Sequence, residues 1–295
     1  KMAYPVSTVL TLDNALKIIM VKSANDVATA IGESIAGSTE AFAARMNAEA
    51  RRIGMTGSHF VNAHGLHSDD QYTTAHDLAV LALALRTEFP DYAPYFSIEA
   101  IGAGEAVIPN HNNLIGRFSG ADGMKTGYTC PSGFNLVATA TRNGRTMLAV
   151  VIGAKSVDSR ADKAAELLAQ GFATPPSTGI TLATLPVSGN GVDQAFNMRD
   201  TVCATKTKKQ REAEAAEARK TIVVPSPHLA SLSAPRMVTQ IVLGGATGPA
   251  SPFMPKLPPF VRPTEIDGIP IPIARPDNAT APETSAQAPA AGVTQ

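Results

Sequence analysis

Apolar residues recur every three to four positions through the first ninety residues, which is the spacing of one helix face. Three of these stretches follow a Ser or Thr that can cap a helix, and two stop at a glycine. The pattern predicts helices over residues 12–21, 26–36, 39–53 and about 75–85, the last opened by a capping box of Thr74 and Asp77.

The pattern changes to β-rich stretches after residue 130. Residues 134–141 and 146–152 flank Asn143-Gly144, a pair typical of a type I′ hairpin turn. A last helix is predicted from about Ser159 to Gln170, with Gly171 as its stop. Helices followed by an antiparallel hairpin and a covering helix indicate an α+β fold.

Proline divides the chain unevenly. Only five of the 22 prolines lie before residue 173, and 14 lie in the last 75 residues. We predict a folded domain over 1–172 and a linker or short extension over 173–205, with weak signals for short strands in 178–203. Residues 206–220 are charged and Ala-rich and lack an apolar stripe, so a helix there would be solvated on all sides. The rest of 206–295 is predicted to be a Pro/Ala-rich, largely disordered tail with one short apolar patch, 237–243.

Charge and cysteine content narrow the function classes. Lys plus Arg and Asp plus Glu both number 25, so the net charge is zero, which argues against a nucleic-acid partner. No stretch approaches the roughly 20 apolar residues of a membrane span. Two cysteines exclude a disulfide-dense scaffold and a Cys-rich zinc module.

Ser23-Ala24-Asn25 lies between the first two predicted helices. In an extended turn the first and third residues point the same way, so a hydroxyl and a carboxamide can face one cleft. The alternative is helix capping, which is the commoner role of these residue types at a helix start.

Lys125-Thr126-Gly127 combines groups that suit a carboxylate, because a fixed positive charge stands beside a hydroxyl donor. The glycine lets another backbone approach closely, as in strand addition by an extended peptide. Arg160, at the start of the last predicted helix, can return to the sheet edge and bind the same carboxylate. The alternatives are a solvated turn lysine and a helix-surface arginine.

In this order the motifs resemble those of the serine-type D-alanyl-D-alanine carboxypeptidases, the low-molecular-mass penicillin-binding proteins of peptidase family S11. The likeness covers residues 1–172 almost without gaps, most clearly over 12–38, 60–82 and 122–155. It implies a penicillin-binding-protein/β-lactamase-like transpeptidase fold, a helical cluster packed on an antiparallel sheet. It also implies a bacterial periplasmic location, with association with the inner membrane left open.

The resemblance implies a reaction in which an upstream serine attacks the carbonyl between two D-alanines and forms an acyl-enzyme. Ser23 would relay a proton to the leaving amine, and Asn25 would orient the acyl-chain amide. The implied catalytic residues are Ser23, Asn25 and Lys125, and the implied substrate-binding residues are Lys125, Thr126, Gly127 and Arg160. The implied partners are a peptidoglycan stem peptide ending in D-Ala-D-Ala and inhibitory β-lactams, with no metal or organic cofactor. The partner of the tail is unknown.

One family motif is missing. Ser-x-x-Lys carries the nucleophile in this family, yet no serine stands three places before a lysine in this sequence. We expect the motif upstream of Lys1, which would make the chain an N-terminally truncated domain of low stability. The alternative is a non-catalytic cell-wall binding protein that keeps the substrate cleft.

Two further features stay open. A cluster of histidines and aspartates is a weak candidate for zinc, because its spacing is not the helical one of zinc proteases. Its members are His59, His64, His67, His76, Asp69, Asp70 and Asp77. Cys130 and Cys203 either pair in an oxidising periplasm, tying 178–203 to the domain, or remain two reduced thiols.

Overall fold

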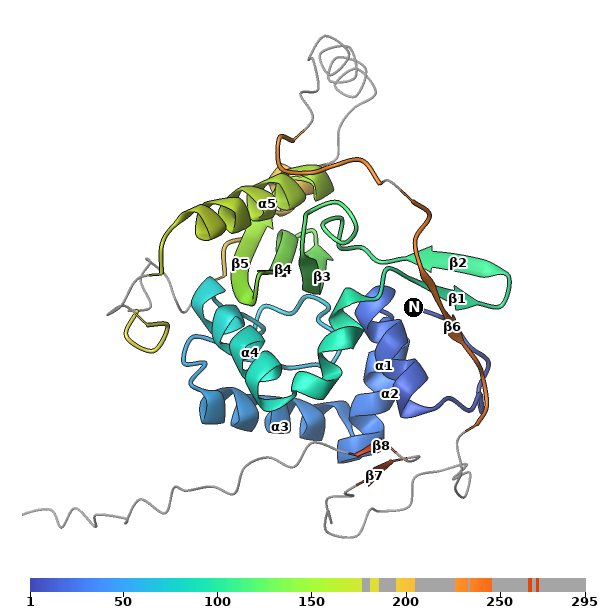
Figure 1. Cartoon of the computed structure of the whole chain (residues 1–295). Coiled ribbons are helices and arrows are strands. Elements are labelled where there is room, and N and C mark those ends of the chain that lie inside the picture. Colours follow the sequence, from blue (N-terminus) through green and yellow to red (C-terminus); the bar gives the residue numbers. More distant parts are fainter. Residues whose placement is uncertain are drawn as a thin grey trace, which may run out of the picture.

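The computed structural model describes residues 1–176, 181–185, 195–204, 226–232 and 234–245. It also gives the backbone of two short paired strands, β7 (Glu265–Ile266) and β8 (Ile269–Pro270). The charged segment 206–220 lies outside these residues. The described part combines a helical cluster with antiparallel sheet, which is the predicted α+β class (Figure 1).

The predicted helices of the first ninety residues are confirmed. Thr11 accepts a hydrogen bond from the Asn14 N–H, and Ser38 accepts one from the Ala41 N–H, so both act as N-caps. Gly37 and Gly54 end their helices in the left-handed conformation that glycine tolerates best. The helices are α1 (Leu12–Val21), α2 (Asn25–Ala36), α3 (Thr39–Ile53) and α4 (Ala75–Glu88).

The cap of α4 differs from the predicted capping box. Thr74 caps the Asp77 N–H as expected, but the Asp77 carboxylate does not return to Thr74. It is fully buried and accepts hydrogen bonds from the Gly57 N–H at 2.8 Å and the Ser58 hydroxyl at 2.7 Å. Asp77 therefore ties the loop after α3 to the start of α4.

The main sheet has the antiparallel order β3-β4-β5, formed by β3 (Ala121–Thr129), β4 (Gly133–Arg142) and β5 (Arg145–Ala154). Asn143 and Gly144 join β4 to β5 with φ of 50° and 75°. Two consecutive positive φ values are what a type I′ turn requires, so the predicted hairpin is confirmed. In the first pairing Lys125 lies opposite Val137.

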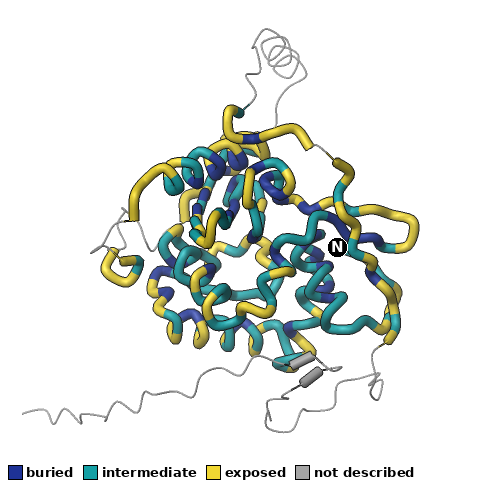
Figure 2. The backbone as a smooth tube through the Cα atoms, in the orientation of Figure 1, coloured by how far each residue is buried: buried dark blue, intermediate teal, exposed yellow. Residues whose placement is uncertain are grey.

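Helix α5 (Val157–Ala173) covers one face of this sheet, and the α1–α4 cluster lies on the other side (Figure 1). Small residues of α5 pack against β4 and β5 in the largest apolar cluster, which Figure 2 shows as a buried layer. The predicted stop at Gly171 is wrong, since the helix continues to Ala173. A Cβ at Gly171 would lie 2.9 Å from the Met147 Sδ, so this glycine serves close packing on β5.

A second small sheet was not predicted. It has the order β2-β1-β6, from β1 (Ala100–Ala103), β2 (Ala106–Pro109) and β6 (Val238–Ile241), and it follows the 3₁₀ helix η1 (Pro90–Ser97). Strand β6 runs parallel to β1, with Ala100 opposite Val238. It lies inside the apolar patch that the sequence predicted in the tail.

The tail therefore contributes ordered structure where it is described. Leu229 is 9% exposed and joins the apolar cluster under α5. Next to it, the Ala230 N–H donates to the Arg117 carbonyl at 2.9 Å, and the Asn14 side chain donates to the Val242 carbonyl at 2.9 Å. Residues 226–232 and 234–245 thus run from the α5 side of the sheet to α1, in contrast to the predicted disordered tail.

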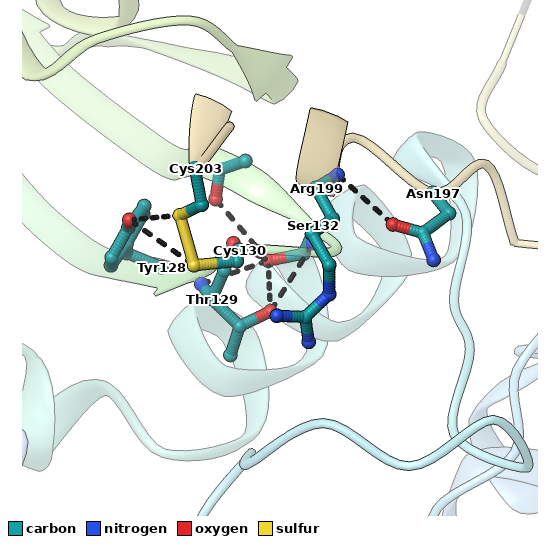
Figure 3. Close-up of a disulfide and its surroundings, with 8 residues drawn as sticks. Tyr128, Thr129, Cys130, Ser132, Asn197, Arg199 and Cys203 are labelled. Atoms are coloured by element: carbon teal, nitrogen blue, oxygen red, sulfur yellow. Dashed lines mark hydrogen bonds between the residues drawn. A yellow bond between two sulfur atoms is a disulfide. The ribbon is translucent and has the colours of Figure 1, made fainter. Parts of the chain in front are cut away.

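The extension after residue 173 returns to the end of β3. Short strands were predicted in 178–203, but residues 195–204 contain a one-turn helix, α6 (Arg199–Val202). Residues 177–180 and 186–194 lie outside the described part. Cys203 forms a disulfide with Cys130, which is the first of the two alternatives that the sequence left open. Figure 3 shows the Tyr128 hydroxyl facing both sulfur atoms, with the Cys203 Sγ at 3.1 Å.

Candidate active site

Ser23 lies just after α1, with φ of 55° in the left-handed region that non-glycine residues seldom adopt. The N-cap of α2 is Ala24, and it makes no side-chain cap bond. Helix capping by Ser23 or Asn25, the alternative reading of this motif, is therefore wrong. The Ser23 hydroxyl instead accepts a hydrogen bond from the Lys125 Nζ at 3.0 Å.

Lys125 projects from β3 towards the end of α1. Its ammonium also donates to the Thr126 carbonyl at 2.7 Å. Burial, and then the positive charge of Arg160, lower the pKa of Lys125 from its usual 10.5 to about 8. At neutral pH the site holds an ammonium that is poorly solvated and close to its titration point.

Arg160 belongs to the first turn of α5 and is only 4% exposed, which excludes the helix-surface reading. Its guanidinium donates to the His111 carbonyl at 3.1 Å and to the Asn135 carbonyl at 3.4 Å. The Arg160 Nε is buried without a hydrogen-bond partner in the described chain. Burial lowers the pKa of this arginine, and its proximity contributes to the lowered pKa of Lys125.

The remaining predicted site residues keep their polar groups available. The Asn25 carboxamide and the Thr126 hydroxyl make no hydrogen bond to any described residue, and both side chains are partly exposed. Asn25 is not joined to Lys125 directly. A Cβ at Gly127 would come no closer than 3.8 Å to another atom, the Cβ of Asn135. The protein's own packing therefore does not require glycine at position 127.

The local charge is positive. Lys22 lies at the end of α1, and His111 lies in the loop before β3, where burial and then the charges of Lys22, Lys125 and Arg160 lower its pKa. Within the described residues no carboxylate forms an ion pair with Lys125 or Arg160. Two buried cations without a counter-charge make a favourable site for an anion.

The start of β3 is anchored by residues that the sequence analysis missed. The Asp122 carboxylate accepts two hydrogen bonds from the Arg86 guanidinium, and one at 2.6 Å from each of the Thr139 and Thr141 hydroxyls. Gly123 follows, where a Cβ would lie 2.7 Å from the Thr139 hydroxyl oxygen. Asp122 stands three residues before Lys125, and that proximity is the only signal in the sequence that could have pointed to it.

The histidines and aspartates that suggested zinc are not gathered in the structure. His59 contacts the Asp70 carbonyl, His67 pairs with Asp69, and His76 lies between Asp77 and the Leu182 carbonyl. Across the described residues there is no group of three or more His, Cys, Asp or Glu side chains that could hold a metal ion.

Comparisons with known proteins agree on one family. A profile described as D-alanyl-D-alanine carboxypeptidase matches residues 2–156. DacC of Escherichia coli, a D-alanyl-D-alanine carboxypeptidase, is 36% identical over 157 residues, which are 53% of this chain and 39% of DacC. The D-alanyl-D-alanine carboxypeptidase DacA of the same species is 32% identical over 183 residues, which are 60% of this chain and 45% of DacA. The chain thus spans less than half the length of these relatives.

Solved structures show the same likeness. The crystal structure of D-alanyl-D-alanine carboxypeptidase DacD from Francisella tularensis matches with a TM-score of 0.56 and 28% identity, covering 58% of this chain and 54% of that one. Penicillin-binding protein 6B from Escherichia coli matches at 0.52 and 31%, covering 58% and 57%. Penicillin-binding protein D2 from Listeria monocytogenes in its ampicillin-bound form matches at 0.51 and 29%, covering 54% and 66%.

Proposed function

The chain belongs to the D-alanyl-D-alanine carboxypeptidase family, and on this basis we propose that residues 1–172 carry the substrate-binding part of a serine D-Ala-D-Ala carboxypeptidase. The whole protein would remove the terminal D-alanine from peptidoglycan stem peptides through an acyl-enzyme. The observation that carries this proposal is the contact between the Lys125 Nζ and the Ser23 Oγ. Arg160 is close by, and no carboxylate of the described residues forms an ion pair with either cation.

The terminal carboxylate of the substrate is the anion that fits this site. Lys125 supplies an ammonium, and Thr126 supplies a hydroxyl donor that has no partner among the described residues. Arg160 adds positive charge from beneath the site, held in place by backbone carbonyls. Preorganised donors in a poorly solvated site bind charge more strongly than the same groups in water.

The peptide itself would lie along the free edge of β3. In the described residues β3 pairs only with β4, so its other edge has no strand partner beside Lys125 and the exposed Gly127. Gly127 meets no close neighbour in the protein, which supports a role in leaving room for the backbone of an incoming strand.

Ser23 and Asn25 would act on the other side of the cleft. The Ser23 hydroxyl touches an ammonium whose pKa is about 8, so a proton can pass between Lys125, Ser23 and the departing amine at neutral pH. The Asn25 carboxamide has both a donor and an acceptor available, which suits it to hold the peptide amide. No step assigned to these residues uses a metal or an organic cofactor.

The nucleophile of the proposed reaction is not among these 295 residues, because Ser-x-x-Lys does not occur in them. The same observation favours a second candidate, a non-catalytic cell-wall binding protein. Labelling of the full-length gene product with fluorescent penicillin separates the two functions. A covalent band that unlabelled ampicillin prevents supports the carboxypeptidase. Peptide binding without such a band supports the binding protein.

The substrate site can be tested with this chain alone. Calorimetric titration should detect binding of a peptide that ends in D-Ala-D-Ala with a free carboxylate, and much weaker binding of the same peptide ending in an amide. Thr126→Val should weaken binding of the acid and leave binding of the amide unchanged. Thr56→Val, at an exposed threonine in the loop after α3, should change neither affinity. Equal affinity for acid and amide would refute the carboxylate site.

A periplasmic location follows from this proposal, since the substrate lies in the cell wall. Within the described part of the chain, no helix has the length and apolar character needed to cross a membrane. Attachment to the inner membrane remains part of the proposal for the whole protein and is not assigned to any described residue.

A further inference from the structure

The loop before β3 contains three consecutive residues, Asn110, His111 and Asn112, that contact both cation-bearing elements of the site. The two asparagines are 5% and 0% exposed, so their amides are committed to internal hydrogen bonds. None of the three was singled out by sequence analysis or by the function proposed above. We call residues 110–112 the bracket segment.

One end of the bracket segment holds β3. The Asn112 Nδ2 donates to the Gly123 carbonyl at 2.9 Å, and the Asn112 Oδ1 accepts from the Leu114 N–H at 3.1 Å. Gly123 lies two residues before Lys125 on the same strand. A hydrogen bond from a fully buried amide therefore fixes the backbone immediately before the lysine.

The middle of the segment holds Arg160. The His111 carbonyl accepts the shorter of the two hydrogen bonds that the Arg160 guanidinium donates, at 3.1 Å. His111 and Asn112 are adjacent, so a movement of either backbone unit changes the place of both cations. The segment is itself anchored, because the Asn110 Nδ2 donates to the Ile98 carbonyl at 2.9 Å and the Asn110 Oδ1 accepts from the Asn112 N–H at 2.9 Å.

We propose that Asn112 is a positioning residue that sets the separation between the Lys125 ammonium and the Arg160 guanidinium, and with it the fit of a carboxylate between them. It touches neither cation and would not touch the substrate. Its effect on the site passes through the Gly123 carbonyl on one side and the His111 carbonyl on the other. The part of this proposal that concerns a ligand rests on the proposed function.

Asn112→Ser is the variant that isolates this role. A serine hydroxyl can still accept from the N–H two residues ahead, which preserves the local turn at Leu114, but it is too short to reach the Gly123 carbonyl. Asn47→Ser is the matched control. The Asn47 amide makes the same kind of paired bond, to the Phe60 carbonyl at 2.7 Å and from the Phe60 N–H at 2.8 Å, but it does so from α3 and away from the site.

Two readouts are needed. The first is the titration of Lys125, followed by NMR of its ε-carbon in the chain without ligand. The second is the dissociation constant of a peptide ending in D-Ala-D-Ala, measured by calorimetry at pH 7. A purely structural role would lower stability in both variants and leave the Lys125 titration unchanged.

For Asn112→Ser we expect the pKa of Lys125 to rise from about 8 towards 10.5, because the loosened strand admits water and moves the ammonium away from Arg160. Peptide binding should weaken by roughly ten- to a hundredfold, the scale for a binding group displaced by about 1 Å. Asn47→Ser should change neither quantity. An Asn112→Ser variant with the wild-type Lys125 titration and peptide affinity would overturn the proposal.

The two proposals can fail separately. If the wild-type chain does not bind the peptide, the proposed function fails, while the Lys125 titration still decides the role of Asn112. If Asn112→Ser does not fold, Asn110→Ser provides the second test, since it removes the anchor to the Ile98 carbonyl and leaves Asn112 in place. It should raise the pKa of Lys125 in the same direction, and an unchanged pKa would overturn the proposal.

Discussion

The buried ammonium of Lys125 should cost the folded protein stability, so Lys125→Met should stabilise the chain. A fall in pKa from 10.5 to about 8 corresponds to about 3 kcal/mol at about 1.4 kcal/mol per pKa unit. Methionine has a similar length and no charge, but it gives up the hydrogen bonds to the Ser23 hydroxyl and the Thr126 carbonyl, each worth about 1 kcal/mol. The expected net gain in the free energy of unfolding is about 1–2 kcal/mol near pH 6.5.

The sign of the pH dependence follows from linkage. Between about pH 8 and pH 10.5 the unfolded chain keeps the Lys125 proton while the folded chain has lost it, so the free energy of unfolding of the wild type rises with pH in this window. The variant has no such titration. Its advantage should therefore be largest below pH 8 and should shrink as the pH rises above it.

Urea denaturation followed by circular dichroism at pH 6.5 and pH 9.5 measures both quantities. Lys163→Met is the control, because the Lys163 side chain is 52% exposed and pairs with Glu166 on the surface. It should show no gain at either pH. A Lys125→Met chain that is less stable than the wild type at pH 6.5, or whose difference does not change with pH, would refute the description of Lys125 as a poorly solvated cation.

Three further outcomes are expected. Binding of a carboxylate-terminated peptide should weaken as the pH rises through about 8, because Lys125 loses its charge there, and an affinity constant from pH 6.5 to 9.5 would contradict this. Reduction of the Cys130–Cys203 disulfide, which spans 73 residues, should lower the free energy of unfolding by about 2–4 kcal/mol, and the double serine variant should not respond to reductant. Leu229→Ala should cost about 2–3 kcal/mol, whereas the more exposed Leu232→Ala should cost less than about 1 kcal/mol, and equal losses would show that the tail does not dock through Leu229.

Elements with local signals could be predicted from the sequence. Thr11 and Ser38 mark helix starts through their own hydrogen bonds, and Asn143-Gly144 marks a turn through the positive φ that these residues tolerate. Gly171 was misread because glycine has two uses, helix termination and close packing. Only the position of Met147 on the facing strand distinguishes them.

Elements that depend on distant partners could not be predicted. Strands β1, β2 and β6 each have four residues, too few for alternation to be recognised. Strand β6 pairs with β1 across more than 130 residues, and Leu229 becomes a core residue only because α5 and the loop at Arg117 accept it. The abundance of Pro, Ala, Ser and Thr after residue 221 favoured a tail for the segment that holds Leu229 and β6.

The candidate site was predicted in part. The motifs supplied Ser23 and Lys125, and their resemblance to a family predicted that they act together. In the structure the Lys125 Nζ and the Ser23 Oγ are 3.0 Å apart. The supporting groups were missed because their roles are set by tertiary contacts. Asp122 and Asn112 are ordinary polar residues in sequence, and only the strand and loop around them turn their side chains into anchors for β3.

The central claim is that a peptide carboxylate binds between the β3 lysine and the first turn of α5. A crystal structure of this chain with a peptide ending in D-Ala-D-Ala tests it most directly. The terminal carboxylate should lie within about 3 Å of both the Lys125 Nζ and the Thr126 Oγ1, with the peptide extended along the free edge of β3. A bound peptide whose carboxylate lies away from both atoms would show that these residues do not form the carboxylate site.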